Sequence, residues 1–432
     1  MSPAKSRDGR GPARSTKPRV VILGAGFAGL AACDLLATTG KKADLEIVIA
    51  DRHNYNTFQP LLYQVATAGL SPGDIAYPVR TYLRRHPNVR FREGTVRAVD
   101  LEQRCVAFAD EGPPLSYDYL IIATGAATNF FGVKGAKEHS NAIYTMEDAV
   151  AVRDHIMGSL ERAAVLGAEH GELTVVLVGG GATGVEMAGT VAELRSAQLK
   201  TTYREIEPKD ARIVLVEQRD RLLGGFDARL AHYAMKVLVS RGVEVRLGVA
   251  VAEVAEGRVI LEGGEVIECG LVVWSAGVSA GELAGNISAP KTRGGRIAVD
   301  ADLRLREHGE VFVIGDVAGA SDGTADGLLP QLAQPAIQEG EHAARQLLEL
   351  ESGRPTKPFS YHDKGVMATI GRKAAVAELP NGLRLRGTLA WLAWLALHLV
   401  FLLGFRNRIA VILNWTWRYL WWRKSPRVIA GG

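Results

Sequence analysis

Glycines at one particular spacing occur twice in this sequence, each time where a dinucleotide phosphate could bind. The first group follows the apolar residues 20–23 and comprises Gly24, Ala25, Gly26, Phe27 and Gly29. In such a group the first glycine permits a tight turn, the second lets the backbone approach a pyrophosphate, and the third lets a helix pack against a strand. The following helix offers its first N–H groups to the phosphates.

An acidic residue supports this interpretation of the first group. Residues 45–51 are predicted to form the next strand, which ends in Asp51, 22 residues after Gly29. A carboxylate about 20 residues after the glycines is placed to bind a ribose hydroxyl. A glycine motif alone is a weak signal, but strand, helix and acid together favour nucleotide binding over a purely structural turn.

The second group repeats this pattern after the predicted strand at residues 174–178. It comprises Gly179, Gly181 and Gly184. Two dinucleotide sites in one chain are what an enzyme needs to pass hydride between a nicotinamide and a flavin. The sequence therefore predicts an oxidoreductase with both cofactors.

Glu217 ends the strand that follows the second group, 33 residues after Gly184. This separation is longer than usual, and the polar residues around 200–210 predict an insertion that lengthens the helix or its loop. Glu217 would accept hydrogen bonds from a ribose diol and repel a 2′-phosphate, which favours NAD(H) over NADP(H). Arg219 and Arg221 are interpreted as solvated loop charges, although they could moderate this preference.

Two shorter motifs extend the pattern, Ala123-Thr124-Gly125 and Gly315-Asp316. With the two glycine groups, they resemble the two-dinucleotide-binding-domain flavoproteins. The resemblance implies that the first group binds FAD, that the chain leaves for an inserted NAD domain, and that it then returns. It also implies that Thr124 and Gly125 line the FAD site, that Asp316 binds the ribityl chain, and that Val96 meets the adenine.

Three further stretches narrow the resemblance, residues 51–72, 331–340 and 361–376. They are similar to type II NADH dehydrogenases, single-subunit NADH:quinone oxidoreductases of the respiratory chain that pump no protons. The similarity runs from about Arg19 to the C-terminus. It implies that NADH gives hydride to FAD and that two electrons then pass to menaquinone or ubiquinone, with protons taken from water and no metal required.

The motif AQxAxQxG begins at Ala333 and resembles the family's quinone site. Gln334 and Gln338 lie four residues apart and so share one face of a helix. Because Ala and Gln favour helices, the motif alone could be an ordinary helix. Together with the glycine groups, it predicts a helix start that faces the flavin, where the two amides bind a quinone carbonyl or the flavin edge.

Two more residues follow from the resemblance. Glu186 is predicted in the first turn of the helix after the second glycine group, where an acid stabilises the helix dipole. The family pattern also places a glutamate there, near the nicotinamide, and the two roles are compatible. Gly277, in "WSAGV", is expected over the ring end of NAD.

Composition limits the alternatives. The net charge of +4 over 432 residues does not indicate a nucleic-acid-binding protein. Cys33, Cys105 and Cys269 form no CxxC pair and no metal-ligand spacing, which indicates inert thiols in a reducing compartment. Disulfide reductases and sulfide:quinone oxidoreductases use paired cysteines, so the lack of a pair in this sequence counts against both classes. A soluble ferredoxin-type reductase and an NADH-sensing flavoprotein remain as further alternatives.

The C-terminus is apolar and rich in tryptophan. Residues 389–405 are apolar apart from His398, just short of the roughly 20 residues that a membrane span needs. Six of the seven tryptophans and six basic residues lie in this region: Trp391, Trp394, Trp415, Trp417, Trp421, Trp422, Arg406, Arg408, Arg418, Arg423, Lys424 and Arg427. Tryptophan and arginine favour the bilayer interface. Two interfacial helices broken near Arg406-Asn407-Arg408 are preferred to a span or a buried helix.

The predicted fold is α/β, with two Rossmann-like dinucleotide-binding domains and a C-terminal amphipathic helical segment that anchors the protein to the membrane. The predicted segments are a disordered basic tail (1–18), the first part of the FAD-binding domain (19–150), the NAD(H)-binding domain (151–285), the second part of the FAD-binding domain (286–380) and the membrane-associated helices (381–432). The resemblance further implies a homodimer bound peripherally to the cytoplasmic face of the cell membrane.

Overall fold

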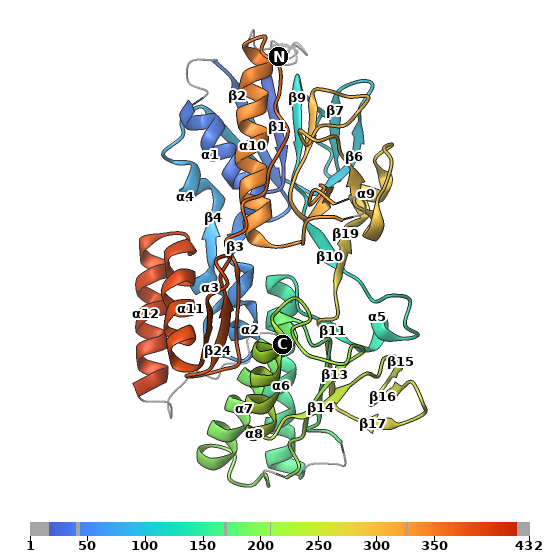
Figure 1. Ribbon diagram of the computed structural model, residues 1–432, viewed down its shortest axis with the longest axis vertical. Coiled ribbons are helices and arrows are strands. Elements are labelled where there is room, and N and C mark those ends of the chain that lie inside the picture. Colours follow the sequence, from blue (N-terminus) through green and yellow to red (C-terminus); the bar gives the residue numbers. More distant parts are fainter. Residues whose placement is uncertain (1–16, 40–43, 168–170, 208, 325–326, 421–432) are drawn as a thin grey trace, which may run out of the picture. The chain divides into compact units, whose positions relative to one another are not determined.

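The computed structural model describes residues 17–39, 44–167, 171–207, 209–324 and 327–420. The predicted basic tail lies outside these residues except for its last two, and Trp421, Trp422 and the basic residues after them also lie outside. Contacts divide the chain into two compact units (Figure 1). Unit 1 comprises residues 1–54, 79–126 and 280–361, and unit 2 comprises residues 55–78, 127–279 and 362–432.

Unit 1 contains a five-stranded sheet in which every pair of neighbours is parallel. In spatial order its strands are β21 (Val311–Val313), β9 (Tyr119–Ile122), β1 (Arg19–Leu23), β2 (Glu46–Asp51) and β5 (Val89–Glu93). The inner strands are runs of Val, Ile and Leu that are buried on both faces, as a parallel sheet covered on both sides requires.

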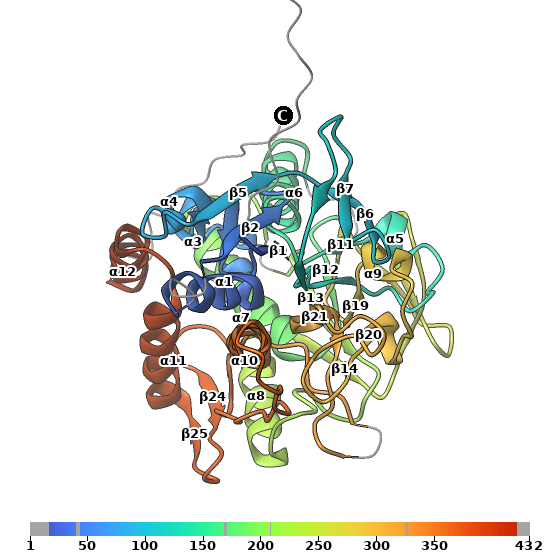
Figure 2. The ribbon, with the colours of Figure 1, turned by 90° about the horizontal axis from the view of Figure 1, so that it is seen from above.

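Two long helices of unit 1 pack against each other although they are far apart in the sequence. They are α1 (Phe27–Thr39) and α10 (Ala333–Glu351), which lie side by side in Figure 1 and Figure 2. Gly340 of α10 makes this approach possible, because a Cβ there would lie 2.3 Å from the carbonyl oxygen of Ala28. A separate antiparallel sheet has the strands β6 (Val96–Asp100), β7 (Cys105–Phe108) and β8 (Leu115–Ser116).

Unit 2 repeats this plan. Its parallel sheet has the strands β11 (Asn141–Ala142), β18 (Leu271–Trp274), β12 (Val175–Val178), β13 (Ile213–Glu217) and β14 (Glu244–Leu247). Its antiparallel sheet has β15 (Val251–Ala255), β16 (Arg258–Leu261) and β17 (Val266–Glu268). Its long helices are α6 (Met146–Leu166), α7 (Ala182–Thr201) and α8 (Ala228–Ser240). The prediction of two Rossmann-like domains is confirmed.

The predicted insertion after the second glycine group is present as a longer helix. Helix α7 has 20 residues, whereas α1, its counterpart in unit 1, has 13.

The remainder of unit 2 is a small sheet with helices packed on it. The sheet is antiparallel, with β23 (Val366–Thr369), β24 (Ala375–Glu378) and β25 (Arg384–Arg386). The helices are α2 (Leu62–Ala66), α3 (Pro72–Ile75), α11 (Gly387–Phe401) and α12 (Phe405–Leu420). Helix α2 packs against α6 and α7, and β23 packs against α7. Residues 55–78 and 362–420 therefore cluster with the second glycine group, whereas the sequence placed them in other segments. The functional limits of those segments remain a prediction.

The C-terminal helices form a hairpin that is broken close to Arg406-Asn407-Arg408, as the sequence predicted. The break covers Leu402 to Gly404, and Arg406-Asn407-Arg408 already lies in the first turn of α12. Leu402 is extended and ends α11, and Gly404, with φ +82°, lets the chain turn into α12 at low cost because glycine has no Cβ. Arg408 then turns back and donates hydrogen bonds to the carbonyl oxygens of Val400 and Leu402, which caps α11.

The inner face of this hairpin is part of the core of unit 2. Trp394, Val411 and Trp415 are buried, and Ala390 and Trp391 pack against the β23–β24–β25 sheet. Among the described helices, none combines the length and the hydropathy needed to cross a bilayer. The buried side chains of its inner face attach the hairpin to unit 2 along one side.

Candidate functional site

The first glycine group forms a turn that other residues would not fit. Gly24 has φ +106°, and a Cβ there would lie 2.2 Å from the carbonyl oxygen of Ala123. A Cβ on Gly29 would lie 1.8 Å from the carbonyl oxygen of Gly24. At Gly26, by contrast, a Cβ would meet no atom within 4 Å. The turn is closed around its first and third glycines and open at its second, which fits a pyrophosphate approaching the backbone.

Asp51 holds this turn in place. Its Oδ2 accepts a hydrogen bond from the backbone N–H of Ala25 at 2.6 Å, and its Oδ1 accepts one from His53 N at 2.8 Å. A carboxylate has about four lone-pair sites, so capacity remains for a ribose diol. Val96 begins β6 on the same edge, close to Gly94, whose N–H donates to the Asp51 carbonyl oxygen at 2.8 Å.

The second glycine group has the same geometry. Gly179 has φ +105°, a Cβ on Gly184 would lie 1.8 Å from the Gly179 carbonyl oxygen, and Gly181 faces open space. Glu217 Oε2 accepts from Gly180 N at 2.5 Å, and its Oε1 accepts from Arg219 N at 2.8 Å. Each unit therefore has one turn, open at its middle glycine and held by an acid, that is suited to a dinucleotide.

Strands β9 and β18, each next to the strand that leads into a glycine turn, are followed by residues at equivalent positions in the two units. Gly125 comes three residues after the end of β9, and Gly277 comes three residues after the end of β18. Thr124 packs under the Gly24 turn, and a Cβ on Gly179 would lie 2.5 Å from Ala276 Cα. The Thr124-Gly125 and Gly277 positions predicted from the sequence are thus at the same edge as the glycine turns of their own units.

The second return of the chain to unit 1 brings Asp316 to the start of α10. Gly315 has φ +71°, and a Cβ there would contact Ala28 at 3.1 Å and Ala336 at 3.6 Å, so the Gly-Asp turn fits between α1 and α10. Gln331 Nε2 donates to the Asp316 carbonyl oxygen at 2.9 Å.

Glu339 is a residue of this site that the sequence reasoning missed. It is 2% exposed, and its Oε2 accepts from Gly315 N at 2.5 Å. Burial raises the pKa of Glu339 to about 8; nearby Asp316 adds to the rise, while the Gly315 N–H and the Arg296 guanidinium oppose it. The sequence did contain a signal, because Glu339 falls on the stripe of α10 that includes Pro335, Ala343 and Leu347 and is otherwise made of small or apolar residues.

Helix α10 begins at Ala333, as the sequence predicted, and Leu332 before it is extended. Gln334 and Gln338 occupy its first two turns. The buried Oε1 of Gln334 has no hydrogen-bond partner among the described residues. A buried acceptor of this kind requires a donor from a ligand or from water. The donor groups of a flavin would supply one, so the residues of unit 1 fit FAD.

Glu186 lies in the second turn of α7, not in the first as predicted, because the helix already begins at Ala182. Its Oε1 accepts from Thr369 N at 3.2 Å. Burial raises the pKa of Glu186 to about 8, and the Thr369 N–H only partly offsets this rise. The carboxyl is therefore mostly protonated at neutral pH, which argues against the helix-dipole role that an ionised acid would have.

The cysteines do not form a redox pair. Cys33 and Cys269 are buried, Cys105 is half-buried, and all three are free. Burial raises the pKa of both Cys33 and Cys269 to about 12. Thiols that stay protonated are poor nucleophiles, so this chain lacks the chemistry of a disulfide relay.

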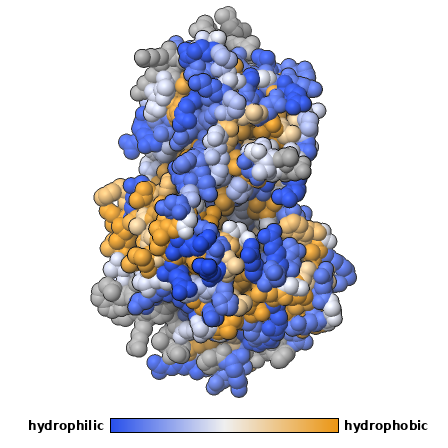
Figure 3. Space-filling model, in the orientation of Figure 1, coloured by the Kyte–Doolittle hydropathy of each residue, from blue (hydrophilic) through white to orange (hydrophobic). Residues whose placement is uncertain are grey.

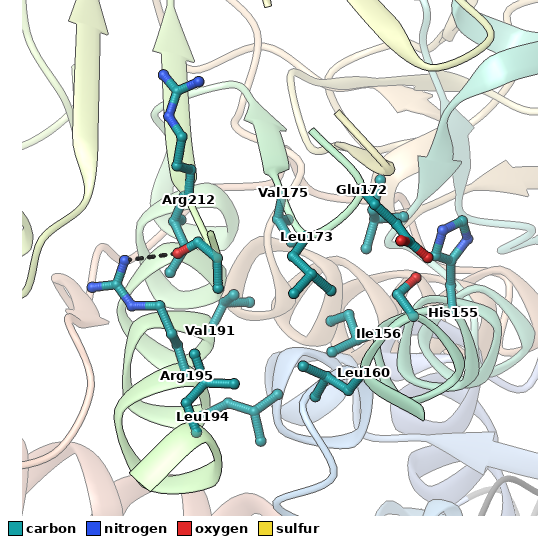
Figure 4. Close-up of a pocket in the computed structure, with 15 residues that line it drawn as sticks. His155, Ile156, Leu160, Glu172, Leu173, Val175, Val191, Leu194, Arg195 and Arg212 are labelled. Atoms are coloured by element: carbon teal, nitrogen blue, oxygen red, sulfur yellow. Dashed lines mark hydrogen bonds between the residues drawn. The ribbon is translucent and has the colours of Figure 1, made fainter. Parts of the chain in front are cut away.

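A small apolar pocket lies at the amino-terminal ends of the parallel strands of unit 2, whereas the glycine turn lies at their carboxyl ends (Figure 4). Val175, Ile213 and Leu271, which line it, are the first residues of their parallel strands, whereas the glycine turn follows the last. Arg195 at its rim donates to the Ala211 carbonyl oxygen at 3.1 Å. With a volume of about 50 Å³, it is too small for a dinucleotide and is not the cofactor site.

Comparison with known proteins agrees with this geometry. The pyridine nucleotide-disulphide oxidoreductase family matches residues 18–340, and the NDH2 C-terminal domain matches residues 363–424. Two Mycobacterium tuberculosis proteins are similar over most of their length. Type II NADH:quinone oxidoreductase NdhA is 40% identical over 92% of this chain and 86% of its own, and type II NADH:quinone oxidoreductase Ndh is 37% identical over 99% and 93%.

Solved structures share the fold. NDH2 from Plasmodium falciparum in complex with NADH has a TM-score of 0.86 at 20% identity, covering 95% of this chain and all of that one. The sulfide:quinone oxidoreductase from Aquifex aeolicus has a TM-score of 0.72 at 18% identity, covering 96% and 99%.

Fold and site together define a flavoprotein of the pyridine nucleotide-disulphide oxidoreductase class, with FAD and NAD(H) as its cofactors. Cysteine chemistry sets the chain apart from the disulfide-dependent members of that class. The chain belongs to the type II NADH:quinone oxidoreductases.

The role of Glu339 can be tested by comparing two substitutions. Glu339→Ala leaves the buried Gly315 N–H without an acceptor, at a cost of about 1–3 kcal/mol. Because Gly315 precedes Asp316, we expect FAD to bind roughly tenfold more weakly or worse. Glu339→Gln retains an acceptor and should bind FAD like the wild type. Flavin fluorescence during reconstitution of the apoprotein measures both affinities, and an alanine variant within twofold of wild type would contradict the role.

The raised pKa of Glu186 predicts a pH-dependent stability. The folded protein holds this proton up to about pH 8, whereas an unfolded glutamate releases it near 4.5. The contribution of the protonated carboxyl is full below pH 4.5 and is lost by about pH 8, at a slope of up to about 1.4 kcal/mol per pH unit. Glu186→Gln should therefore gain stability relative to wild type between pH 5 and 8. Melting temperatures of both proteins across this range test it, and a constant difference would refute it.

Proposed function

We propose that the protein oxidises NADH and reduces a membrane quinone, using non-covalently bound FAD and pumping no protons. The observation that carries this proposal is the pair of glycine turns, each open at its middle glycine and held by an acid, in a chain without paired cysteines. One turn suits FAD and the other NADH. Gln334 and Asp316 lie beside the first, and Glu186 lies beside the second.

FAD, when bound, accepts a hydride from NADH and supplies two electrons to the quinone. The residues of unit 1 would bind and orient it. Asp51 would hold the adenosine ribose, the Gly24 turn and the start of α1 would hold the pyrophosphate, and Asp316 would hold the ribityl chain. The Gln334 amide would bind the flavin edge or a quinone carbonyl, and Gln338, one helical turn later, is proposed as its partner in this role.

Glu217 is proposed to select NADH. Its carboxylate already orders the turn through Gly180 N and Arg219 N, and its remaining lone pairs would accept both hydroxyls of the adenosine ribose. A 2′-phosphate at the same place would lie against this negative charge. Arg219 and Arg221 are exposed, so water screens much of their opposing charge.

Glu186 is proposed to hold a proton for the quinone reaction. Reducing a quinone to a quinol takes two electrons and two protons, and hydride transfer brings two electrons with only one proton. A carboxyl with a pKa near 8 can donate a proton at neutral pH and recover it from water. Since the quinone itself dissolves in the bilayer, the protein must also work at a membrane surface.

The hairpin of α11 and α12 is proposed as the surface that binds the membrane. Its outer face is strongly apolar, and hydrophobic side chains gather over it in Figure 3. The exposed apolar side chains are Leu389, Leu392, Leu397, Val400, Phe401, Phe405, Ile409, Ile412, Leu413 and Trp417. A patch of this extent on a monomer marks an interaction site. Exposed Arg406 beside it suits anionic head groups.

We further propose that the enzyme is peripheral, on the cytoplasmic face of the cell membrane, and that it is a homodimer. The family resemblance supports both statements. Light scattering in detergent, corrected for bound detergent, tests the dimer.

The activity itself is tested on the purified holoenzyme in detergent. We expect a flavin absorption spectrum, release of the yellow colour on acid precipitation, and rapid reduction of a quinone analogue by NADH but not by NADPH. Glu217→Gln should narrow the NADH/NADPH ratio of kcat/KM by tenfold or more, equivalent to at least about 1.4 kcal/mol. Flavin reduction by NADH without quinone turnover would instead favour an NADH-sensing flavoprotein.

Membrane attachment is tested with a triple variant of the outer face, Val400→Ser, Phe405→Ser and Leu413→Ser. These side chains are 66%, 77% and 61% exposed, so their loss should not disturb the core. Each inserted apolar side chain contributes up to about 1.5–3 kcal/mol, so binding to anionic liposomes should fall by at least tenfold. Turnover with a long-chain quinone should fall with it, while turnover with a water-soluble acceptor should persist.

A second triple variant provides the control. Val165, Leu166 and Val239 are comparably exposed but lie on α6 and α8. Their substitution by serine should leave liposome binding unchanged. If both triple variants bind liposomes like the wild type, the hairpin is not the membrane surface.

A further inference from the structure

Helix α2 carries two polar side chains into the core of unit 2. All five of its residues are buried, and Tyr63 and Gln64 are only 5% and 3% exposed. Buried polar groups require hydrogen-bond partners. The partners of these two residues come from widely separated parts of the chain, the C-terminal hairpin on one side and the β23 strand on the other.

These partners join into one chain of hydrogen bonds. Trp415 Nε1 donates to Gln64 Oε1 at 2.8 Å, and Gln64 Nε2 donates to Tyr63 Oη at 3.0 Å. Tyr63 Oη lies 3.1 Å from Thr369 Oγ1, and the backbone N–H of Thr369 donates to Glu186 Oε1 at 3.2 Å. The chain therefore connects α12 with the carboxyl of Glu186, and every residue in it is buried and belongs to unit 2.

The indole gives this chain a direction. An indole N–H can only donate, so the amide oxygen of Gln64 must face Trp415 and its NH₂ group must face Tyr63. Tyr63 Oη then accepts from Gln64, and it shares one further hydrogen bond with Thr369 Oγ1. Removing the indole donor would leave Gln64 free to reverse its amide, and the order of the remaining bonds would be lost.

One end of this chain of hydrogen bonds, Trp415, lies on a helix whose other face is exposed. Trp415 lies on the inner face of α12, whereas Ile412, Leu413 and Trp417 on the same helix are exposed on the proposed membrane face. Two further side chains hold this inner face, since Asn407 Nδ2 donates to the Ala76 carbonyl oxygen and Asn414 Nδ2 to Asp74 Oδ2, both at 2.8 Å. A change in the position of α12 would thus act directly on Gln64.

We propose that Gln64 and Tyr63 are positioning residues that couple the packing of α12 to the placement of Glu186. This chain of hydrogen bonds from Trp415 to Glu186, called the relay below, holds Thr369 in one position when α12 is packed against α2. The N–H of Thr369 contacts the carboxyl of Glu186. Contact of the outer face with the membrane stabilises that packing, so the quinone step is fastest on the membrane. The coupling to catalysis rests on the proposed function, whereas the coupling between the residues themselves does not.

Two kinds of measurement test the relay on the full-length holoenzyme. The first is stability. Tyr63→Phe removes one hydroxyl and little volume, and Glu186→Gln changes the carboxyl at the far end. If the residues are coupled, the losses or gains in Tm of the two single variants will not add up in the double variant. Additive shifts in Tm would overturn the proposal whether or not the protein reduces quinone.

The second measurement separates the two half-reactions by rapid mixing. In Tyr63→Phe, Gln64→Met and Trp415→Phe, we expect quinone to reoxidise the reduced flavin about tenfold more slowly. Reduction of the flavin by NADH should stay within twofold of wild type, and FAD content should be unchanged. The Tyr63→Phe/Glu186→Gln double variant should be no slower than Glu186→Gln alone. Unchanged reoxidation in all three single variants would overturn the proposal.

Two comparisons make these outcomes specific. Tyr55→Phe is a matched control, because Tyr55 also belongs to unit 2 and donates to Glu147 Oε1 at 2.8 Å outside the relay. It should leave both half-reactions unchanged. Trp415→Phe should still bind liposomes like the wild type, because its side chain faces inward, which separates coupling from anchoring. A wild type that is inactive with quinone but shows non-additive Tm shifts would refute the proposed function and leave the relay intact.

Discussion

The rest of this structure depends on one close contact in each unit. The helix that follows the glycine group packs against the carbonyl oxygen of the first glycine of that group. In each unit this oxygen occupies the place that a Cβ on the third glycine would need, at 1.8 Å. Because the third glycine has no Cβ, the strand and the helix can pack closely. The middle glycine of the turn then faces open space. The acid at the end of the next strand then fixes the turn by accepting a backbone hydrogen bond within it. The open middle glycine and the turn held by an acid, which suit a phosphate and a ribose, both depend on this one contact.

Residues whose function is local could be predicted from the sequence. Gly24, Gly179, Asp51 and Glu217 act through backbone geometry at fixed separations, and the start of α10 at Ala333 follows from a motif. Glu339 could not be found in this way, because no motif of fixed spacing links it to its partner Gly315 and only the packing of α10 brings them together. The relay was missed for the same reason.

Helix positions that depended on packing were also less well predicted. Glu186 was predicted in the first helical turn, whereas α7 begins at Ala182, two residues before the third glycine, which places Glu186 in the second turn. The hairpin break was predicted near Arg406-Asn407-Arg408 and lies directly before these residues, where Gly404 has a positive φ and Arg408 caps α11. The same hairpin was predicted as a membrane anchor, and that role remains a prediction. Its inner face also supplies Trp394 and Trp415 to the core of unit 2, so one element combines an apolar exposed face with polar internal contacts.

The construction of each unit from three separate stretches has a consequence for the newly made chain. Helix α10 packs on α1 from about 300 residues further along, and β21 completes a sheet that began with β1. Contacts between such distant residues form slowly, because a long loop must close before they stabilise anything. While the chain is being synthesised, the first strands and helix of unit 1 must therefore wait with their apolar faces uncovered until the last third emerges. A flavin-binding turn of this kind is completed late, and the early segments depend on protection from aggregation during translation.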